Sequence, residues 1–233
     1  MDIRLTGISA LLLLTLPSMG QQQPSRGVNF YSFEKEAALG RALADDFRRR
    51  APSVDDADLL AYVTRVAARL NEFAQSHFPL TIEISNATDS KRDTAGLPGG
   101  YVFVPLRLLA SAEDEAEVAR PVAHAIAHIA TGQATRMATR GLIVNLATVP
   151  LIFMGGLAHD HAGALLIPVG LRKFQEEDEA QAERLGGEWM ARSGLADSTF
   201  VTGEFAAMRE RARAIARLKT GDPAPPSLRK RRP

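Results

Sequence analysis

The sequence predicts a mostly helical α+β domain, and three observations support this class. Long segments carry apolar residues at the spacing of one helix face, as at Leu39, Leu43 and Phe47. Two short segments, 80–85 and 101–104, instead have the alternation and composition of β-strands. The chain has 233 residues and no internal repeat, which fits a single domain. We therefore expect one small sheet, followed by helices that pack around a common core.

The expected helices follow the periodic apolar positions and their end signals. Ser111 is the expected N-cap of the helix that contains Pro121, and Gly132 is the expected end of that helix. Because proline inside a helix removes one backbone hydrogen bond, we expect a kink there. Residues 96–100 are rich in glycine and predict a turn between the strands. The expected helices cover 32–50, 55–76, 111–131, 173–193 and 198–219.

The N-terminus has the layout of a signal peptide. Arg4 precedes an apolar run through Leu14, and small residues at Ser18 and Gly20 stand at the cleavage spacing. The run is shorter than the ~20 residues that a membrane-spanning helix needs. We therefore assign 1–20 to a signal peptide cleaved after Gly20, and expect the mature protein to be exported. Residues 21–30 are polar and predict a linker.

Charge and cysteine content exclude several classes. The chain has 28 Lys and Arg against 27 Asp and Glu, so its net charge favours no class of partner, and we expect no nucleic-acid partner. The basic cluster at 229–232 belongs to a Pro-rich tail, 221–233, which we interpret as solvated. The absence of cysteine excludes disulfides, thiolate zinc ligands and a cysteine nucleophile.

Residues 141–170 form an unusual apolar stretch. Their only acid is Asp160, and they contain no Lys or Arg. The apolar runs fall short of a membrane span, so we favour a buried hairpin or lid over a membrane-contacting segment. His159 and His161, near its middle, are interpreted as solvated loop residues.

Two pairs of side chains have the spacing of a metal site. His124 and His128 are four residues apart and so leave the same face of a helix, as in the HExxH arrangement. Glu179 and Glu183 repeat this spacing on a later helix, from which a carboxylate can complete a His₂Glu zinc site. The spacings alone also fit a solvated acidic face around 176–179, so both interpretations remain open.

The order of the motifs resembles the metallopeptidases of family 48. These include the CAAX prenyl endopeptidases, the HtpX heat-shock peptidases and the periplasmic beta-barrel-assembly-enhancing proteases. An N-terminal segment also resembles the secreted bacterial branch of the family, which implies a location in the periplasm or cell envelope. The matching segments are 27–36, 99–104, 112–119, 124–128 and 179–186.

The resemblance implies a zincin-like (gluzincin) domain over 31–220, with a small β-sheet packed on the active-site helices. It implies that His124, His128 and Glu179 are the ligands of one zinc ion. Glu183 stands where the family has an aspartate that accepts a hydrogen bond from a ligand histidine. The implied activity is that of a metalloendopeptidase in protein quality control of the envelope.

The chain departs from the family pattern at several positions. Ala125 stands where the family has the catalytic glutamate, which takes a proton from the attacking water and delivers it to the leaving nitrogen. Pro121 replaces an ordinary helix former. Asp222-Pro223 replaces the His-Pro of many relatives.

Three readings follow from these departures. We favour a zinc-binding pseudo-peptidase that binds unfolded or membrane-bound polypeptide clients, including outer-membrane proteins. A second reading is an active endopeptidase in which Asp178 or Glu183 replaces the missing base. A third is a structural remnant that binds no metal.

Overall fold

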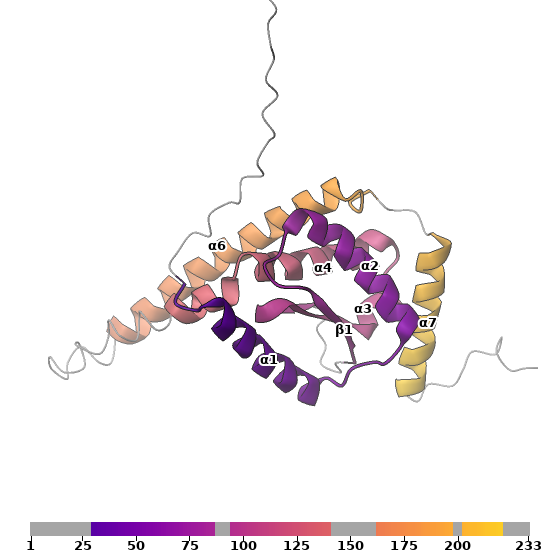
Figure 1. Cartoon of the computed structure of the whole chain (residues 1–233), viewed down its shortest axis with the longest axis horizontal. Helices are drawn as coiled ribbons and strands as arrows, with labels where there is room; N and C mark the ends of the chain where they lie inside the picture. The colour runs from indigo at the N-terminus through magenta and orange to yellow at the C-terminus, as the bar shows by residue number, and fades with distance from the viewer. Residues whose placement is uncertain (1–28, 87–93, 141–161, 198–201, 221–233) are drawn as a thin grey trace, which may run out of the picture.

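A computed structural model of the chain describes residues 29–86, 94–140, 162–197 and 202–220 (Figure 1). Helices surround a small central sheet, as the sequence predicts for a mostly helical α+β domain. The elements in chain order are α1 (Phe33–Arg50), α2 (Ala57–Ala74), β1 (Thr81–Ser85), β2 (Ala95–Leu97), η1 (Pro98–Gly100), β3 (Tyr101–Pro105), α3 (Leu106–Ser111), α4 (Glu115–Ala130), α6 (Ala162–Arg192) and α7 (Gly203–Thr220). Residues 133–140 are also helical.

The sheet has three strands in the order β1-β3-β2. β1 pairs with β3 in parallel, with Ile82 opposite Val102, whereas β2 pairs with β3 antiparallel, with Gly96 opposite Val102. β2 is therefore an edge strand. It occupies part of the 96–100 segment that the sequence predicts to be a turn, because pairing with β3 extends its backbone up to the 3₁₀ turn at Pro98.

Different helices cover the two faces of the sheet. Side chains alternate along a strand, so successive residues contact the helices on opposite faces. Ile84 and Val104 lie in the main core with α2 and α4. On the opposite face, Phe103 stacks on Phe47 of α1, with ring centroids 4.2 Å apart. α1 thus closes one face, whereas α2 and α4 close the other (Figure 1).

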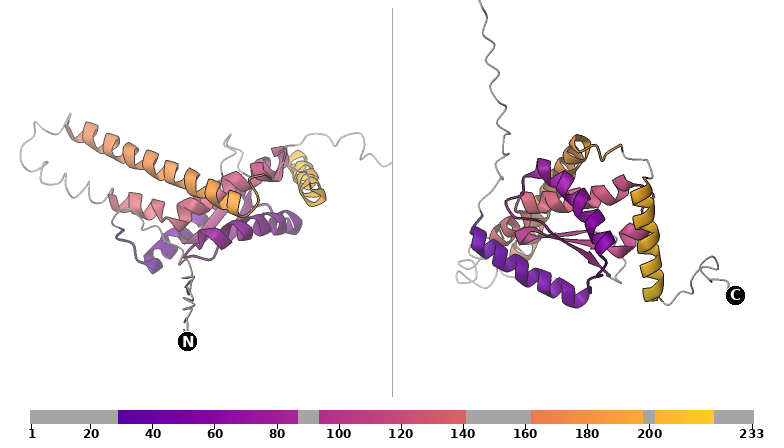
Figure 2. Two further views of the ribbon diagram at one scale, coloured as in Figure 1. Left: turned by 90° about the horizontal axis from the view of Figure 1, so that it is seen from above. Right: turned by 45° about the vertical axis from the view of Figure 1, so that its right-hand side comes forward.

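Helix α6 packs along α4, and small residues allow the close approach. Ala182 is fully buried, and a Cβ added to Gly186 would lie 3.3 Å from the backbone of Ala123 and His124. A larger residue at Gly186 would push α6 away from the histidines. The N-terminal part of α6 extends past the sheet (Figure 2).

The boundaries of several elements correct the sequence predictions. Ser111 is not an N-cap but the last residue of α3, a short helix that the sequence analysis missed. The N-cap of α4 is Asp114, whose Oδ1 accepts a hydrogen bond from the backbone N–H of Glu117 at 2.9 Å. Helix α6 begins at Ala162 rather than Lys173. Helix α7 begins at Gly203 rather than near residue 198.

Other predictions fall outside the described residues. These include the signal peptide, the cleavage site after Gly20, the tail 221–233, and His159 and His161. The proposed lid or hairpin at 141–170 also stays a prediction, because only 162–170 are described, as part of α6. Among the described residues, no helix combines the length and apolar character that crossing a membrane requires.

Candidate metal centre

His124 and His128 project from the C-terminal half of α4 toward the same point. Their Nε2 atoms lie 2.9 Å apart, and the rings meet edge to face. The helix places them together because residues four apart are neighbours on one face. Pro121 lies one turn before His124, yet α4 runs unbroken from Glu115 to Ala130. Both histidines follow the proline, so they keep their helical spacing, and the expected kink at Pro121 stays a prediction.

Glu179 of α6 completes the cluster. Its Oε2 lies 3.1 Å from Nε2 of His124 and 3.6 Å from Nε2 of His128. Ligand atoms ~2.0–2.1 Å from a tetrahedral zinc ion lie about 3.3–3.4 Å apart, so three such atoms leave a place for one ion. Two imidazoles and one carboxylate are also the donor types of a catalytic zinc site. The residues fit zinc, and their role as metal ligands stays a prediction.

Burial favours the neutral form of His128, which is the form that can act as a metal ligand. Desolvation lowers its pKa below the ordinary value, and the nearby charge of Glu179 only partly opposes the shift. The imidazole is therefore neutral at neutral pH, which is the form that binds a metal.

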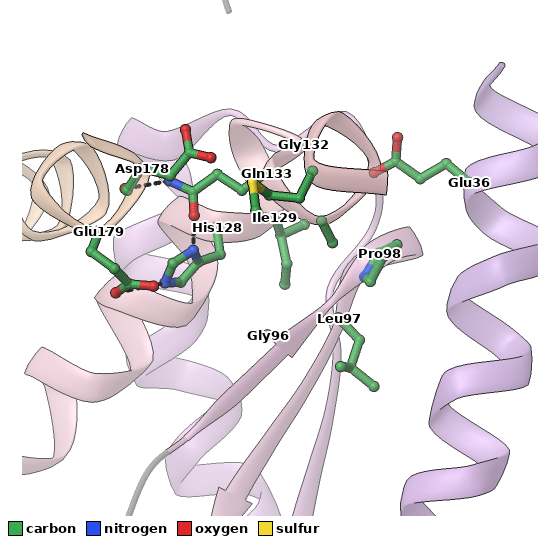
Figure 3. Close-up of a pocket in the computed structure, with 12 residues that line it drawn as sticks. Glu36, Gly96, Leu97, Pro98, His128, Ile129, Gly132, Gln133, Asp178 and Glu179 are labelled. Carbon is green, nitrogen blue, oxygen red and sulfur yellow. Dashed lines mark hydrogen bonds and ion pairs between the residues drawn. The ribbon is translucent and has the colours of Figure 1, made fainter. Parts of the chain in front are cut away.

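Gln133, which the sequence does not single out, contacts His128 at Nδ1, the ring nitrogen outside the cluster. Oε1 of Gln133 is hydrogen-bonded to Nδ1 of His128, and Nε2 of Gln133 donates to the backbone carbonyl of Asp178 (Figure 3). Gln133 lies in the helical segment 133–140, outside the helices that the sequence predicts. A polar residue directly after Gly132 was the one available signal, and it is weak because such positions are usually solvated.

Asp178, one of the two acids that could replace the missing base, is engaged in a buried ion cluster. Its Oδ1 lies 3.3 Å from Nη2 of Arg136, and its Oδ2 lies 2.9 Å from Nη1 of Arg140. Arg136 is itself fully buried. Both carboxylate oxygens are thus held by guanidinium groups of the 133–140 segment rather than by the histidine cluster. This pairing disfavours Asp178 as a replacement for the catalytic glutamate, and that alternative stays a prediction.

Glu183 lies on the other edge of the His124 ring. Its Oε2 is 3.6 Å from Nδ1 of His124, whereas the cluster forms at Nε2. At this distance the two groups form no hydrogen bond, so the role of Glu183 in orienting the histidine stays a prediction. The position does not suit a base that must reach the metal side of the ring. Nδ1 of His124 is buried and has no hydrogen-bond partner among the described residues.

Ala125 faces the contact between α4 and the edge strand. Its side chain is 1% exposed, and a Cβ on Gly96 of β2 would overlap the Ala125 backbone carbonyl. The strand and the helix therefore touch where the sequence pattern expects a glutamate. A methyl group at this position neither accepts nor donates a proton.

A cavity of about 270 Å³ adjoins the cluster. His128 and Glu179 lie at one end and Glu36 of α1 at the other, while the β2–η1 segment and the 132–137 segment form opposite walls (Figure 3). Leu97, Pro98, Ile129 and Met137 supply apolar surface. The cavity thus reaches from the candidate metal position into the fold.

Two histidines four apart on one helix and a glutamate on an adjacent helix are the ligand types found in zinc metallopeptidases. The sequence model of peptidase family M48 matches residues 55–211. This span is more than half of the chain, and the protein belongs to peptidase family M48. No curated protein matches the chain.

Proposed function

We propose that the protein is a zinc-binding pseudo-peptidase, which holds one zinc ion and binds polypeptide beside it without efficient hydrolysis. The observation that carries this proposal is Ala125, which lies buried next to a cluster whose three ligand atoms converge. His124, His128 and Glu179 would hold the ion. Zinc bound there would supply Lewis acidity toward a carbonyl or a water.

Among the described residues, neither Asp178 nor Glu183 is placed to take over the proton transfers of peptide hydrolysis. Asp178 is paired with Arg136 and Arg140, and Glu183 approaches His124 from the edge of the ring opposite to the cluster. One general acid–base group contributes ~10²–10⁴-fold to a rate, and here a single group would serve two steps. We therefore expect hydrolysis to be slower than in an active relative by at least ~10²-fold.

The edge strand and the cavity support binding of extended polypeptide. β2 ends the sheet beside α4, so its outer edge is the place where a further strand would pair. The cavity offers apolar walls for a side chain next to the candidate metal position. The clients we propose are unfolded or membrane-bound polypeptides, among them outer-membrane proteins.

We propose that the protein works after export, in the periplasm or cell envelope. The signal-peptide layout of residues 1–20 supports this location. Expression with the native N-terminus and mass measurement of the product tests it. A mature chain that begins at Gln21 and fractionates with the envelope is expected, whereas an uncleaved chain in the cytosol would refute export.

The test of zinc binding and hydrolysis uses this purified product, prepared without chelators. Bound metal is measured by mass spectrometry beside a His124→Ala control, and cleavage of an unstructured, fluorescently labelled polypeptide is followed. We expect about one equivalent of zinc, lost in the control, and no cleavage above background. Binding of the same polypeptide is measured by fluorescence anisotropy.

Two outcomes contradict the proposal in different ways. Cleavage that disappears in His128→Ala would identify an active endopeptidase with an unorthodox base. Absence of metal in both proteins would identify a structural remnant.

A further inference from the structure

We infer that Gln133 is a positioning residue for the metal centre, which fixes the tautomer of His128 and sets its helix against that of Glu179. Gln133 is 4% exposed and lies between His128 and Asp178, the residue that precedes Glu179 (Figure 3). It therefore contacts both helices that carry the candidate ligands.

The direction of the Gln133 amide follows from its second partner. The backbone carbonyl of Asp178 can only accept, so the NH₂ group of Gln133 faces it. A carbonyl oxygen has two lone pairs, so this bond is compatible with the helical bond of the same group. The amide oxygen must then face His128, because the two ends of the amide point in different directions.

The direction of the amide decides the tautomer of His128. An amide oxygen has no hydrogen to donate, so Nδ1 of His128 carries the proton and donates it. Nε2 then keeps its lone pair, and this atom lies 2.9 Å from Nε2 of His124. The neutral histidine is thus held in the tautomer that can bind a metal through Nε2.

The same amide also fixes the register of α6 on α4. It binds the backbone of Asp178, whose carboxylate is held by Arg136 and Arg140. Arg136 in turn donates to the backbone carbonyl of Thr131, just after α4. Asp178 is therefore tied through its backbone and its side chain, one residue before Glu179. Loss of the amide would free both the His128 ring and this part of α6.

The tautomer is read on the metal-free protein, so this readout does not depend on the proposed zinc binding. Long-range ¹H–¹⁵N spectra of protein labelled in histidine distinguish a protonated Nδ1 from a protonated Nε2. The chain has five histidines, and His128→Ala assigns the relevant signals. We expect His128 in the wild type to be almost wholly the Nδ1–H form.

Three variants separate the role of the amide from simple packing. Gln133→Leu keeps most of the volume without hydrogen bonds, and should give a mixture of tautomers with zinc affinity weakened ~10–100-fold. Gln133→Glu keeps an acceptor toward His128, and should retain the Nδ1–H form with a smaller loss of zinc affinity. Thr139→Val changes a fully buried polar residue of the same helical segment, which hydrogen-bonds Phe30 and Asn29 rather than the histidines, and should alter neither.

The outcomes distinguish this inference from the proposed function. An unchanged His128 tautomer in folded Gln133→Leu would overturn the positioning role, as would an equal loss of zinc affinity in Thr139→Val. If Gln133→Leu does not fold, loss of the Nδ1–H form in Gln133→Glu overturns it instead. A wild type with the Nδ1–H form but no zinc would leave the positioning role standing and refute the proposed zinc binding.

Discussion

The two histidines of the candidate metal centre lie one helical turn apart, yet they are supported in different ways. His128 is backed by Gln133 and by the buried cluster of Asp178, Arg136 and Arg140. In the described part of the chain, Nδ1 of His124 has no hydrogen-bond partner, and the Glu183 side chain, which is 66% exposed, lies 3.6 Å away. Sequence spacing treats the two histidines as equivalent. The difference indicates that one side of the site is preorganised, while the other has room to adjust when a metal binds.

The largest expected effect is on zinc affinity, and it should be similar for the two histidines despite this asymmetry. His124→Ala and His128→Ala each remove one of three ligands, so both should weaken zinc binding by more than the ~10–100-fold cost of losing an outer partner. Isothermal titration with zinc measures this. If His124→Ala keeps near-normal affinity, the ion is held by the anchored side alone.

The free energy of unfolding should fall much more when the buried cluster beside His128 is broken than when exposed ion pairs of α6 are broken. Asp178→Ala removes the carboxylate that faces buried Arg136, and breaking a buried pair in this way costs ~3–5 kcal/mol. Denaturant unfolding of the metal-free protein measures the loss. Glu188→Ala on the same helix breaks exposed pairs and should cost under ~1 kcal/mol. Equal losses would show that the buried cluster does not support the His128 side.

Ala125→Glu tests whether His124, His128 and Glu179 together hold a geometry that supports hydrolysis. Ala125→Glu should produce hydrolysis of unstructured polypeptide at least ~10²-fold above the wild type, because it supplies the missing proton acceptor. A fluorogenic cleavage assay measures it, and His128→Ala in the same background must abolish it. A folded, zinc-loaded Ala125→Glu without activity would mean that the ligands converge but the substrate is misplaced.

The smallest effect is expected on the adjustable side. A metal on Nε2 leaves the ring proton of His124 on Nδ1, where Glu183 is the nearby acid. Glu183→Gln keeps an acceptor but removes the charge, so zinc affinity should fall by at most ~10-fold. Competition with a chromogenic chelator resolves such a change. A loss greater than that in Gln133→Leu would reverse the comparison between the two histidines.

Local patterns were sufficient for much of the fold. The apolar periodicity predicted α1 and α2 to within a few residues, and the alternation around Ile82 and Ile84 predicted β1. They failed where an element is decided by its neighbouring element rather than by its own period. β2 is a strand because β3 pairs with it, and Asp114 rather than Ser111 begins α4 because α3 already occupies the preceding residues.

The sequence by itself determined the candidate ligands and the missing proton acceptor. Helical spacing places His124 and His128 on one face, and the identity of Ala125 excludes acid–base chemistry at that position. Only the tertiary structure decided that Glu179 reaches both histidines, that Asp178 is occupied, and that Gln133 holds His128. The physical reason is that these contacts depend on how closely α6 approaches α4, which packing between distant segments sets and no local period encodes.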